Sequence, residues 1–266
     1  MKNIRLYLHR TQLKRGGRLV LDIDDLDIPG GAFVGVIGVN GAGKSTFLKV
    51  CCGLLRPDRG TVQFGDCDLT KLSSWRKTNL RKRMGYIPQA AEYNADLPFT
   101  LREVVAMGRA GVKSLGARLT ETDDEIIDFW IEKLGLMDRR NQTFRSLSGG
   151  EQQKSLIARA MAQEPALLML DEPGANLDFH WKRQITDIID RLHQHTGITV
   201  ILVSHETNLL PASCRRIILL HEGKVLADDT AENVFASEAL ERAYQCRLET
   251  VEVERRKYIY ARAKES

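Results

Sequence analysis

A glycine-rich segment at residues 38–46 constrains the fold of this chain more than any other feature. It follows an apolar run, residues 32–37, and matches the pattern G-x-x-x-x-G-K-[ST] at every defined position. Its glycines permit a tight turn in which successive backbone N–H groups face one phosphate chain, and a helix beginning at Lys44 adds the positive end of its dipole. The residues predicted to hold the phosphates are Gly38, Val39, Asn40, Gly41, Ala42, Gly43, Lys44, Ser45 and Thr46. The dinucleotide pattern G-x-G-x-x-G is excluded, because Thr46 stands where its last glycine is required.

The composition is that of an ordinary globular chain. Its 266 residues suit one large domain, or one domain with a small subdomain, and 43% hydrophobic residues exclude intrinsic disorder. The net charge is +4 and the pI about 8.8, below the value of about 9 that is typical of nucleic-acid-binding domains. We therefore expect no nucleic-acid partner.

Targeting and cysteine patterns point to a reducing compartment. No apolar run approaches the roughly 18 residues of a membrane-spanning helix. Lys2, Arg5 and Arg10 leave no room for the apolar core of a signal peptide. The five cysteines are odd in number and form no Cys-x-x-Cys pair, so neither a disulfide framework nor a metal cluster is favoured, and we expect a cytosolic location.

Apolar runs alternate with helical patterns, which predicts an α/β fold with a mostly parallel sheet and crossover helices. Strands are predicted at residues 19–28 (an edge strand), 32–37, 84–87, 167–170, 198–203 and 217–220, and helices at 47–55, 101–109 and 123–134. Residues 90–147 carry no strand signal, which predicts an all-helical insert. Beyond Gly223 we expect two further strands or turns, a helix at 231–244 and a terminal hairpin at 250–253 and 258–261.

Polar residues follow three of the predicted strands. Asp171 and Glu172 come after residues 167–170, so Asp171 suits the hydration shell of Mg²⁺ and Glu172 can reach a water in line with the γ-phosphate. His205 follows 198–203 and can orient that water, while Gln89 follows 84–87 and can reach the metal. Each has an ordinary alternative: an acid at a strand end, a structural histidine, a glutamine at a turn. Together with the phosphate loop they predict catalytic roles for Lys44, Glu172 and His205, and a Mg²⁺ site at Ser45, Gln89 and Asp171.

These motifs, in this order and with Leu147-Ser148-Gly149-Gly150-Glu151-Gln152 between them, resemble the ATP-binding cassette ATPases of ABC transporters. The resemblance covers about residues 19–232. It implies a phosphate-loop (RecA-like) core with an antiparallel β edge and an inserted helical subdomain. Residues 1–89 and 148–236 are expected to form the nucleotide-binding core, 90–147 the helical subdomain, and 237–266 a C-terminal extension.

The resemblance also implies a head-to-tail homodimer that shares two ATPs. In the family, the signature (here Ser148, Gly149, Gly150 and Glu151) binds the γ-phosphate held by the opposite subunit, and Asp178 lies in a dimer-contact loop. The helix that follows Ser148 is about 20 Å long and places Ser148 far from Asp171, which agrees with a site facing another subunit. The ordinary role of Ser148 and Asp178, as helix N-caps, can hold at the same time.

A narrower resemblance concerns residues 98–109, which are similar to ATPase subunits of importers for iron chelates, haem and vitamin B12, and for zinc and manganese. It implies a peripheral ATPase at the cytoplasmic face of the inner (plasma) membrane. Its expected partners are ATP with Mg²⁺, a second copy of the chain, transmembrane permease subunits and, indirectly, a substrate-binding protein. The expected cargo is a metal chelate, namely iron–siderophore, haem or cobalamin. The alternatives are a zinc/manganese importer ATPase and a soluble cassette ATPase of iron–sulfur cluster assembly. A phosphate-loop kinase or GTPase is disfavoured by the Leu-Ser-Gly-Gly segment.

The chain departs from the family pattern at a few positions. Arg15 stands where an aromatic residue usually stacks on adenine, and its planar guanidinium is predicted to take that place, the alternative being a solvated loop residue. Glu151 replaces a commoner Gln, Gly174 a usual Thr or Ser, and Glu206 a usual Asp. None of these three affects the expectation of ATP hydrolysis.

Overall fold

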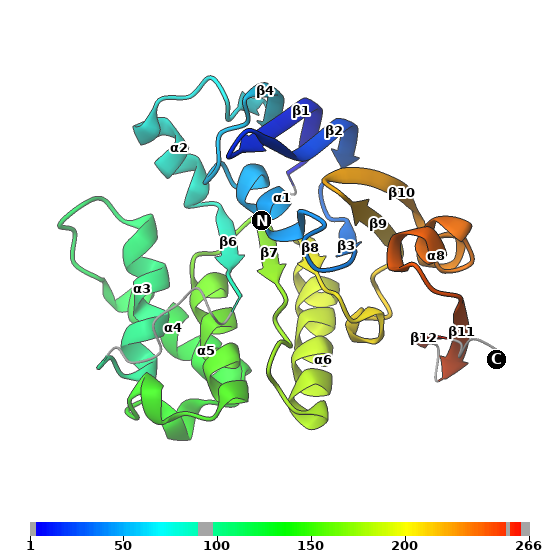
Figure 1. The fold of residues 1–266 in the computed structure, drawn as a ribbon. Helices are drawn as coiled ribbons and strands as arrows, with labels where there is room; N and C mark the ends of the chain where they lie inside the picture. The colour runs from blue at the N-terminus through cyan, green and yellow to red at the C-terminus, as the bar shows by residue number, and fades with distance from the viewer. Residues whose placement is uncertain (1–3, 90–97, 254–255, 262–266) are drawn as a thin grey trace.

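A ten-stranded sheet with the order β5-β4-β1-β2-β10-β9-β3-β8-β7-β6 organises the protein (Figure 1). The computed structural model describes residues 4–89, 98–253 and 256–261. The strands are β1 (Leu6–Arg15), β2 (Arg18–Ile28), β3 (Phe33–Ile37), β4 (Arg59–Phe64), β5 (Cys67–Asp68), β6 (Met84–Ile87), β7 (Leu167–Asp171), β8 (Thr199–Val203), β9 (Arg216–His221), β10 (Lys224–Thr230), β11 (Leu248–Val253) and β12 (Arg256–Ala261). The helices are α1 (Lys44–Cys51), α2 (Ser74–Arg81), α3 (Leu101–Val112), α4 (Glu121–Lys133), α5 (Gly149–Ala162), α6 (Phe179–Thr196), α7 (Ala231–Phe235) and α8 (Glu238–Tyr244), with short 3₁₀ turns η2 (Met137–Arg139), η3 (Phe144–Ser146) and η4 (Thr207–Leu209).

The parallel half of the sheet consists of β9, β3, β8, β7 and β6. Every residue of β3, β7 and β8 is buried, as expected where helices cover both faces of a parallel sheet. Because these strands are parallel, their carboxyl ends meet at one edge. That edge receives the phosphate loop after β3, Asp171 from β7, and the segments that lead to His205 and Gln89.

The other half is the antiparallel region formed by β1, β2, β4 and β5. The prediction that residues 19–28 form an edge strand is wrong, because β2 lies between β1 and β10. No strand is predicted for β1 because its buried leucines, Leu6, Leu8 and Leu13, are few and stand among polar and charged residues, with the alternation broken near Arg10. β4 and α2 were also missed.

Two expected elements have different bounds. The helix predicted at 47–55 begins at Lys44 and ends at Cys51, and Gly53 follows with φ 66°. The helix predicted at 231–244 is two helices, α7 and α8, because Ala236 and Ser237 interrupt it. The terminal hairpin is confirmed as β11 and β12, which pair antiparallel.

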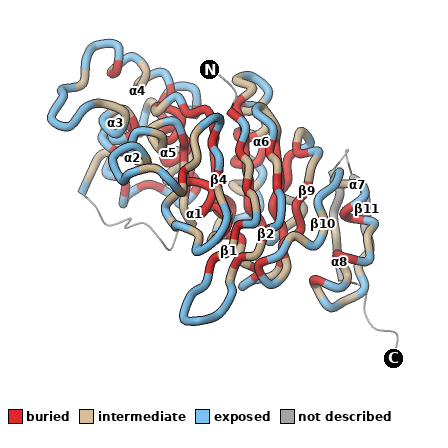
Figure 2. The backbone as a smooth tube through the Cα atoms, turned by 90° about the horizontal axis from the view of Figure 1, so that it is seen from above, coloured by how far each residue is buried: buried red, intermediate tan, exposed pale blue. Residues whose placement is uncertain are grey.

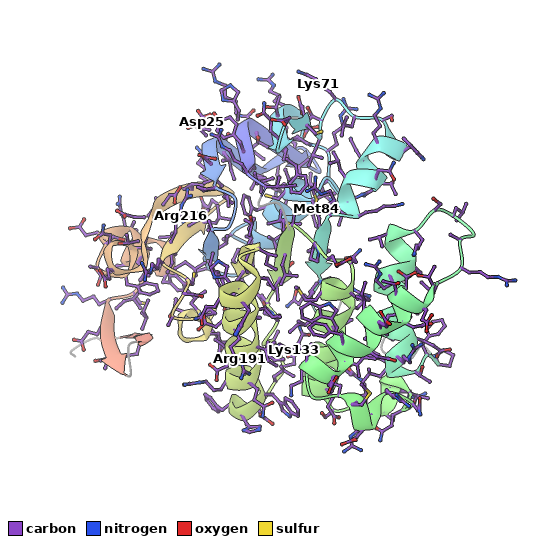
Figure 3. All side chains as sticks on the ribbon, turned by 180° about the vertical axis from the view of Figure 1, so that it is seen from behind. Asp25, Lys71, Met84, Lys133, Arg191 and Arg216 are labelled. Atoms are coloured by element: carbon purple, nitrogen blue, oxygen red, sulfur yellow. The ribbon has the colours of Figure 1, made fainter. Side chains whose placement is uncertain are left out.

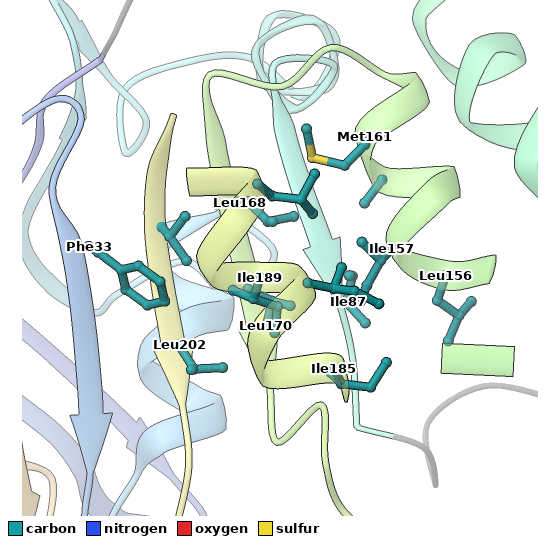
Figure 4. Packing of buried hydrophobic residues seen from close by; sticks show 14 of the residues in the cluster. Phe33, Ile87, Leu156, Ile157, Met161, Leu168, Leu170, Ile185, Ile189 and Leu202 are labelled. Atoms are coloured by element: carbon teal, nitrogen blue, oxygen red, sulfur yellow. The ribbon is translucent and has the colours of Figure 1, made fainter. Parts of the chain in front are cut away.

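Two hydrophobic clusters pack against the sheet and share its central strands, with Phe33 in one and Val34 in the other. Figure 2 shows buried residues along these strands and exposed residues in the outer loops. One cluster joins the strands to α5 and α6 through residues such as Ile157, Leu170 and Ile189 (Figure 4). It continues into α3 and α4, so the helical insert and the sheet share one core. The other cluster contains Phe47 and Leu48 of α1 and the inner side chains of β1, β2 and β4.

The described part of the helical insert, residues 98–147, contains no strand apart from a single bridge between Thr100 and Thr143, which confirms its helical character there. Residues 90–97 lie outside the described residues.

The Asp123 side chain is buried at the start of α4 and pairs with Lys113 and Arg109. The hydrogen bond from Lys113, followed by the Thr120 backbone N–H, holds the pKa of Asp123 well below its usual range. No helix within the described ranges is both long enough and apolar enough to span a bilayer.

The packing of α3 against α5 yields a stability prediction. A Cβ atom at Gly108 would lie 2.1 Å from the Arg159 carbonyl oxygen, whereas at Gly111, on the same helix, the nearest atom would be Gln163 Nε2 at 3.7 Å. Gly108→Ala should therefore lower the free energy of unfolding by about 1–3 kcal/mol through overpacking. Gly111→Ala should leave it unchanged or raise it by up to about 1 kcal/mol. Denaturant unfolding of both variants checks this, and equal stabilities would contradict the close helix contact.

Candidate active site

The phosphate loop runs from β3 into α1 and is shaped by close backbone contacts. Gly38 has φ 153°, and a Cβ atom there would lie 2.2 Å from the Leu220 carbonyl oxygen. Gly43 has φ 98°, and its Cβ would lie 2.9 Å from the Val20 carbonyl oxygen. Glycine is required at both positions, because any side chain would push the loop off its neighbouring strands.

Lys44 lies at the centre of this loop. Its side chain is only 6% exposed, and its Nζ donates to the carbonyl oxygens of Gly38 at 2.9 Å and Val39 at 3.1 Å. Burial lowers the pKa of Lys44, while the carboxylates of Glu172 and Asp171 act in the opposite direction. A phosphate anion in the loop would favour the charged ammonium in the same way as these carboxylates.

Glu172 is the meeting point of the predicted catalytic residues. Its φ of 49° is in the left-handed region, which is uncommon for a residue other than glycine. Its carboxylate lies 3.7 Å from Lys44 Nζ, 3.2 Å from His205 Nδ1 and 3.2 Å from Gln89 Nε2. The structure thus brings together Lys44, Glu172, His205 and Gln89 from four separate segments. Such backbone strain is typical of functional sites, where surrounding structure holds a residue in place.

A cavity of about 890 Å³ opens beside these residues. Its lining includes the predicted residues Asn40, Gly41, Gly43, Lys44, Ser45, Thr46, Gln89, Glu172 and His205. Gly38, Val39 and Ala42 belong to the same loop without lining the cavity, and Asp171 is fully buried behind it at the end of β7.

Arg15 is exposed and does not line this cavity. It lies at the end of β1, across the turn from Arg18. Arg18, Leu19 and Val20 of β2 line the cavity instead. The contact of Arg15 with adenine stays a prediction. On this hairpin, the residues that form the cavity wall belong to β2 and not to β1, where Arg15 lies.

Sequence reasoning missed Lys182, which lines the same cavity from the first turns of α6. Its Nζ lies 2.5 Å from the Glu206 carboxylate, which in turn lies 3.7 Å from His205 Nε2. His205 therefore stands between two carboxylates, those of Glu172 and Glu206. The sequence could have indicated Lys182 by its position four residues after Asp178, on a helix that starts at the same edge of the sheet.

The environment of Gly174 accounts for one departure from the family pattern. A Cβ atom there would lie 3.0 Å from Leu209 Cδ1 and 3.5 Å from Lys182 Cγ. The branched side chain of Thr would need these neighbours to move. Glycine at position 174 thus leaves room for the side chains of Leu209 and Lys182 to pack against the backbone there.

The signature residues occupy a different place. Ser148 caps α5: its Oγ accepts from the Glu151 N–H at 3.3 Å, and the Glu151 carboxylate accepts from the Ser148 N–H at 2.9 Å. The Ser148 N–H also holds the pKa of Glu151 below its usual range. Ser148, Gly149, Gly150 and Glu151 are not among the residues that line the cavity. The structure therefore does not bring them to the chain's own phosphate loop.

Two side chains fix the start of α5 and α6. A Cβ atom at Gly150 would lie 1.9 Å from Trp181, so the indole ring covers the first turn of α5. Asp178 caps α6 by accepting from the Trp181 N–H at 2.9 Å. The N-cap roles of Ser148 and Asp178 are confirmed, and their contacts with a second subunit stay predictions.

The oxygen donors at this edge fit a hard cation that keeps ligands from outside the protein. Ser45 and Gln89 line the cavity, and the Asp171 carboxylate lies behind them. Among the described residues there is no group of three or more His, Cys, Asp or Glu that could hold a metal ion by itself. This sparse donor set suits Mg²⁺, which usually takes one or two protein ligands and completes its shell with phosphates and water.

Comparison with known sequences places the chain in a family. A family model described as ABC transporter matches residues 21–175. The chain is 33% identical to the iron(3+)-hydroxamate import ATP-binding protein FhuC of Bacillus subtilis, over 89% of this chain and 86% of that protein. It is 34% identical to the hemin import ATP-binding protein HmuV of Rhodopseudomonas palustris, with 88% and 85% coverage. It is 36% identical to the zinc uptake ATP-binding protein ZnuC of Bacillus subtilis, with 77% and 86% coverage.

Solved structures agree with this placement. The chain matches a dimeric ATP-binding cassette in a post-hydrolysis state, bound to ADP and Pi, with a TM-score of 0.75, 28% identity and coverage of 85% of this chain and 98% of that one. It shares its fold with a chain of an inward-facing ABC transporter, with a TM-score of 0.83, 24% identity and 98% and 99% coverage. With its phosphate loop and the carboxylate of Glu172 at one edge of the sheet, this chain belongs to the ABC transporter family and is an ATP-binding cassette that hydrolyses ATP.

Proposed function

We propose that the chain powers the import of a metal chelate, in the class of iron–siderophore, haem or cobalamin. The relatives named for iron(3+)-hydroxamate and hemin import support this class. Residues 98–109 resemble the subunits of chelate importers and of zinc and manganese importers alike, so this segment supports import of a metal species without separating the two. A zinc importer is the second candidate, because a zinc uptake protein is 36% identical.

The observation that carries the catalytic assignment is the position of Glu172. Its carboxylate can accept a proton from a water beside the phosphate loop, or orient that water for attack on the γ-phosphate. His205 holds this carboxylate at 3.2 Å, and Gln89 donates to it from the start of the helical insert. Lys44 stabilises the charge that develops on the phosphate oxygens. Mg²⁺, held by Ser45, Asp171 and Gln89, would supply further positive charge at the same oxygens.

We infer that catalysis takes place in a head-to-tail homodimer. Ser148–Glu151 offer a hydroxyl, two glycines in the first turn of α5 and the positive end of that helix, which suit an anion. Since they do not line the chain's own cavity, a second copy would bring them to its phosphates. Asp178 would contact the partner in the same dimer. ATP binding closes the pair and hydrolysis reopens it.

The proposed division of the chain follows from this cycle. Residues 1–89 and 148–236 form the nucleotide-binding core, 90–147 the helical subdomain, and 237–266 an extension. The helical subdomain joins Gln89 to the signature, so it is suited to pass the motion to transmembrane permease subunits. The chain then works at the cytoplasmic face of the inner membrane, where a substrate-binding protein delivers the cargo on the other side.

Removing the charge of Glu172 tests the catalytic assignment. Glu172→Gln should lower ATP turnover about 100-fold or more, because the amide cannot accept a proton, while ATP binding is kept. The bound ATP should then hold the protein as a dimer in light-scattering measurements. Glu164→Gln is the matched control: Glu164 also has a left-handed φ, of 52°, but pairs with Arg109 at the surface. Turnover near that of the wild type, without an ATP-dependent dimer, would show that Glu172 is not the catalytic carboxylate.

A pair of capping variants tests the shared site. Ser148→Asp and Ser148→Asn both keep an N-cap residue for α5, so both should fold, with Ser148→Asp slightly less stable because it faces the Glu151 carboxylate to which the Ser148 hydroxyl donates. Only Ser148→Asp places a negative charge where the partner's γ-phosphate would dock. Ser148→Asp should lose most ATP hydrolysis and most ATP-driven dimerisation, while ATP binding to the monomer is unchanged. Ser148→Asn should keep part of the activity. Equal activity of the two variants would remove the support for a phosphate contact at Ser148.

Deletion of the gene tests the cargo. Growth on one chelated metal or corrin source should be lost, while growth on sugars and amino acids is spared. Wild-type protein should restore uptake of the labelled chelate, and the Glu172→Gln variant should not, because transport needs hydrolysis. A defect that appears only under zinc limitation would favour the second candidate. Intact chelate uptake with loss of sugar or amino-acid uptake would refute the class.

A further inference from the structure

The segment from Lys71 to Arg83, which contains α2, is strongly cationic. Its charged residues, here called the basic face, are Lys71, Arg76, Lys77, Arg81, Lys82 and Arg83. The segment contains no acidic residue. None of the residues of α2 is buried, and the helix lies at the periphery of the molecule (Figure 1).

The basic face is almost free of internal charge pairing. Lys71 lies 3.3 Å from Asp68, and its side chain is still 79% exposed. The other five cations make no ion pair within the described residues. Arg81 donates to Thr78 and Lys82 to the Lys113 carbonyl oxygen, and neither bond neutralises a charge. Apart from Lys71, these cations pair with no carboxylate in the described part of the chain, which leaves their charge available to an external anion.

Large apolar side chains protrude beside the same charges. Trp75, at the start of α2, is 73% exposed. Leu115 is fully exposed in the loop after α3, two residues from Lys113, to which Lys82 donates. Leu54 is 48% exposed after α1, and its neighbour Leu55 packs against the same hydrophobic cluster as Leu72 and Leu80 of the basic segment. Three separate elements thus present a protruding apolar group around one cationic surface.

We propose that the basic face, with Trp75, Leu54 and Leu115, docks on the headgroup region of an anionic phospholipid bilayer. Tryptophan and leucine are the side chains that enter the interfacial layer of a membrane, and clustered Lys and Arg bind anionic headgroups. This inference goes beyond the proposed function, because it gives the chain a membrane contact of its own that needs no permease.

The shape of the surface favours lipid over a folded protein or a nucleic acid. Trp75, Leu54 and Leu115 protrude singly, from a helix start and two loops, whereas a protein partner needs a contiguous and complementary apolar core. A fluid interface accommodates separate side chains at different heights. A nucleic acid would use the cations and stack on Trp75, but it offers no place for two leucines.

Sedimentation of the full chain with vesicles tests the proposal. The wild type should bind vesicles of phosphatidylcholine with phosphatidylglycerol, and should bind pure phosphatidylcholine vesicles at least 10-fold more weakly. Since each cation near the surface contributes a factor of about five, Arg76→Glu with Lys77→Glu should lower the partition coefficient by about 25-fold or more. Trp75→Ala should lower it several-fold without changing the charge. The basal ATPase rate should be unchanged, because α2 takes no part in the active site.

A matched control separates the surface from net charge. Lys133→Glu with Arg191→Glu makes the same change in charge at the opposite end of the molecule from Lys71 (Figure 3), and should bind anionic vesicles nearly as well as the wild type. Equal loss in the two double variants would overturn the proposal. So would absence of vesicle binding by the wild type, or vesicle binding unaffected by the Arg76 and Lys77 changes while binding of DNA or RNA is lost.

Fluorescence gives a second and independent readout. The chain has three tryptophans, of which Trp130 is buried and Trp181 is half-buried. Insertion of Trp75 into the interface should shift the emission to shorter wavelength when anionic vesicles are added. Trp75→Phe should abolish the shift and keep most of the binding. A shift that persists in Trp75→Phe would show that Trp75 does not enter the bilayer.

Discussion

The close approach of the phosphate loop to its neighbouring strands is the constraint on which the rest of the site depends. At Gly38 a single methyl group would collide with the carbonyl of Leu220 on β9, and at Gly43 with that of Val20 on β2. The loop is therefore fixed against both halves of the sheet at once. That position sets the direction of α1 and encloses the ammonium of Lys44 among carbonyl oxygens. Phosphates entering the loop would replace these oxygens as partners, and the buried charge would then act on them in a medium of low dielectric.

Around this loop, carboxylates alternate with nitrogen-bearing side chains in one connected row. Lys44, Glu172, His205, Glu206 and Lys182 follow one another at 2.5–3.7 Å, from the phosphate loop to α6. The left-handed backbone of Glu172 directs its carboxylate toward Lys44 and His205, while its N–H is held by Val203 on β8. The same carboxylate accepts from Gln89, where the helical insert begins. The carboxylate beside the phosphate site thus contacts the segment that leads, through the helical insert, to the signature helix.

Much of the fold could be predicted because the buried parallel strands are continuous apolar runs, and because the residues that end them carry the chemistry. The errors have the same physical origin. β1 has three leucines among polar and charged residues and gives no clear strand signal, and without β1 the sequence predicts β2 as an edge strand. Lys182 was missed because its role depends on a contact with Glu206, which no spacing along the chain reveals. Arg15 was placed by its distance from a glycine turn, while the cavity wall comes from Arg18 across that turn.

The sequence by itself determined the phosphate loop, the parallel core, the order of the motifs and the family, since each depends on local patterns that a backbone must satisfy: glycines where a Cβ has no room, apolar runs where both faces are covered, and caps at Ser148 and Asp178. Only the tertiary structure decided which side chains meet. It placed Glu172 between Lys44 and His205, left Ser148 out of the lining of its own cavity, and brought the charges of α2 near Leu54 and Leu115. Such contacts join residues far apart in the chain, and they are set by the packing of whole helices and strands rather than by the preferences of single residues.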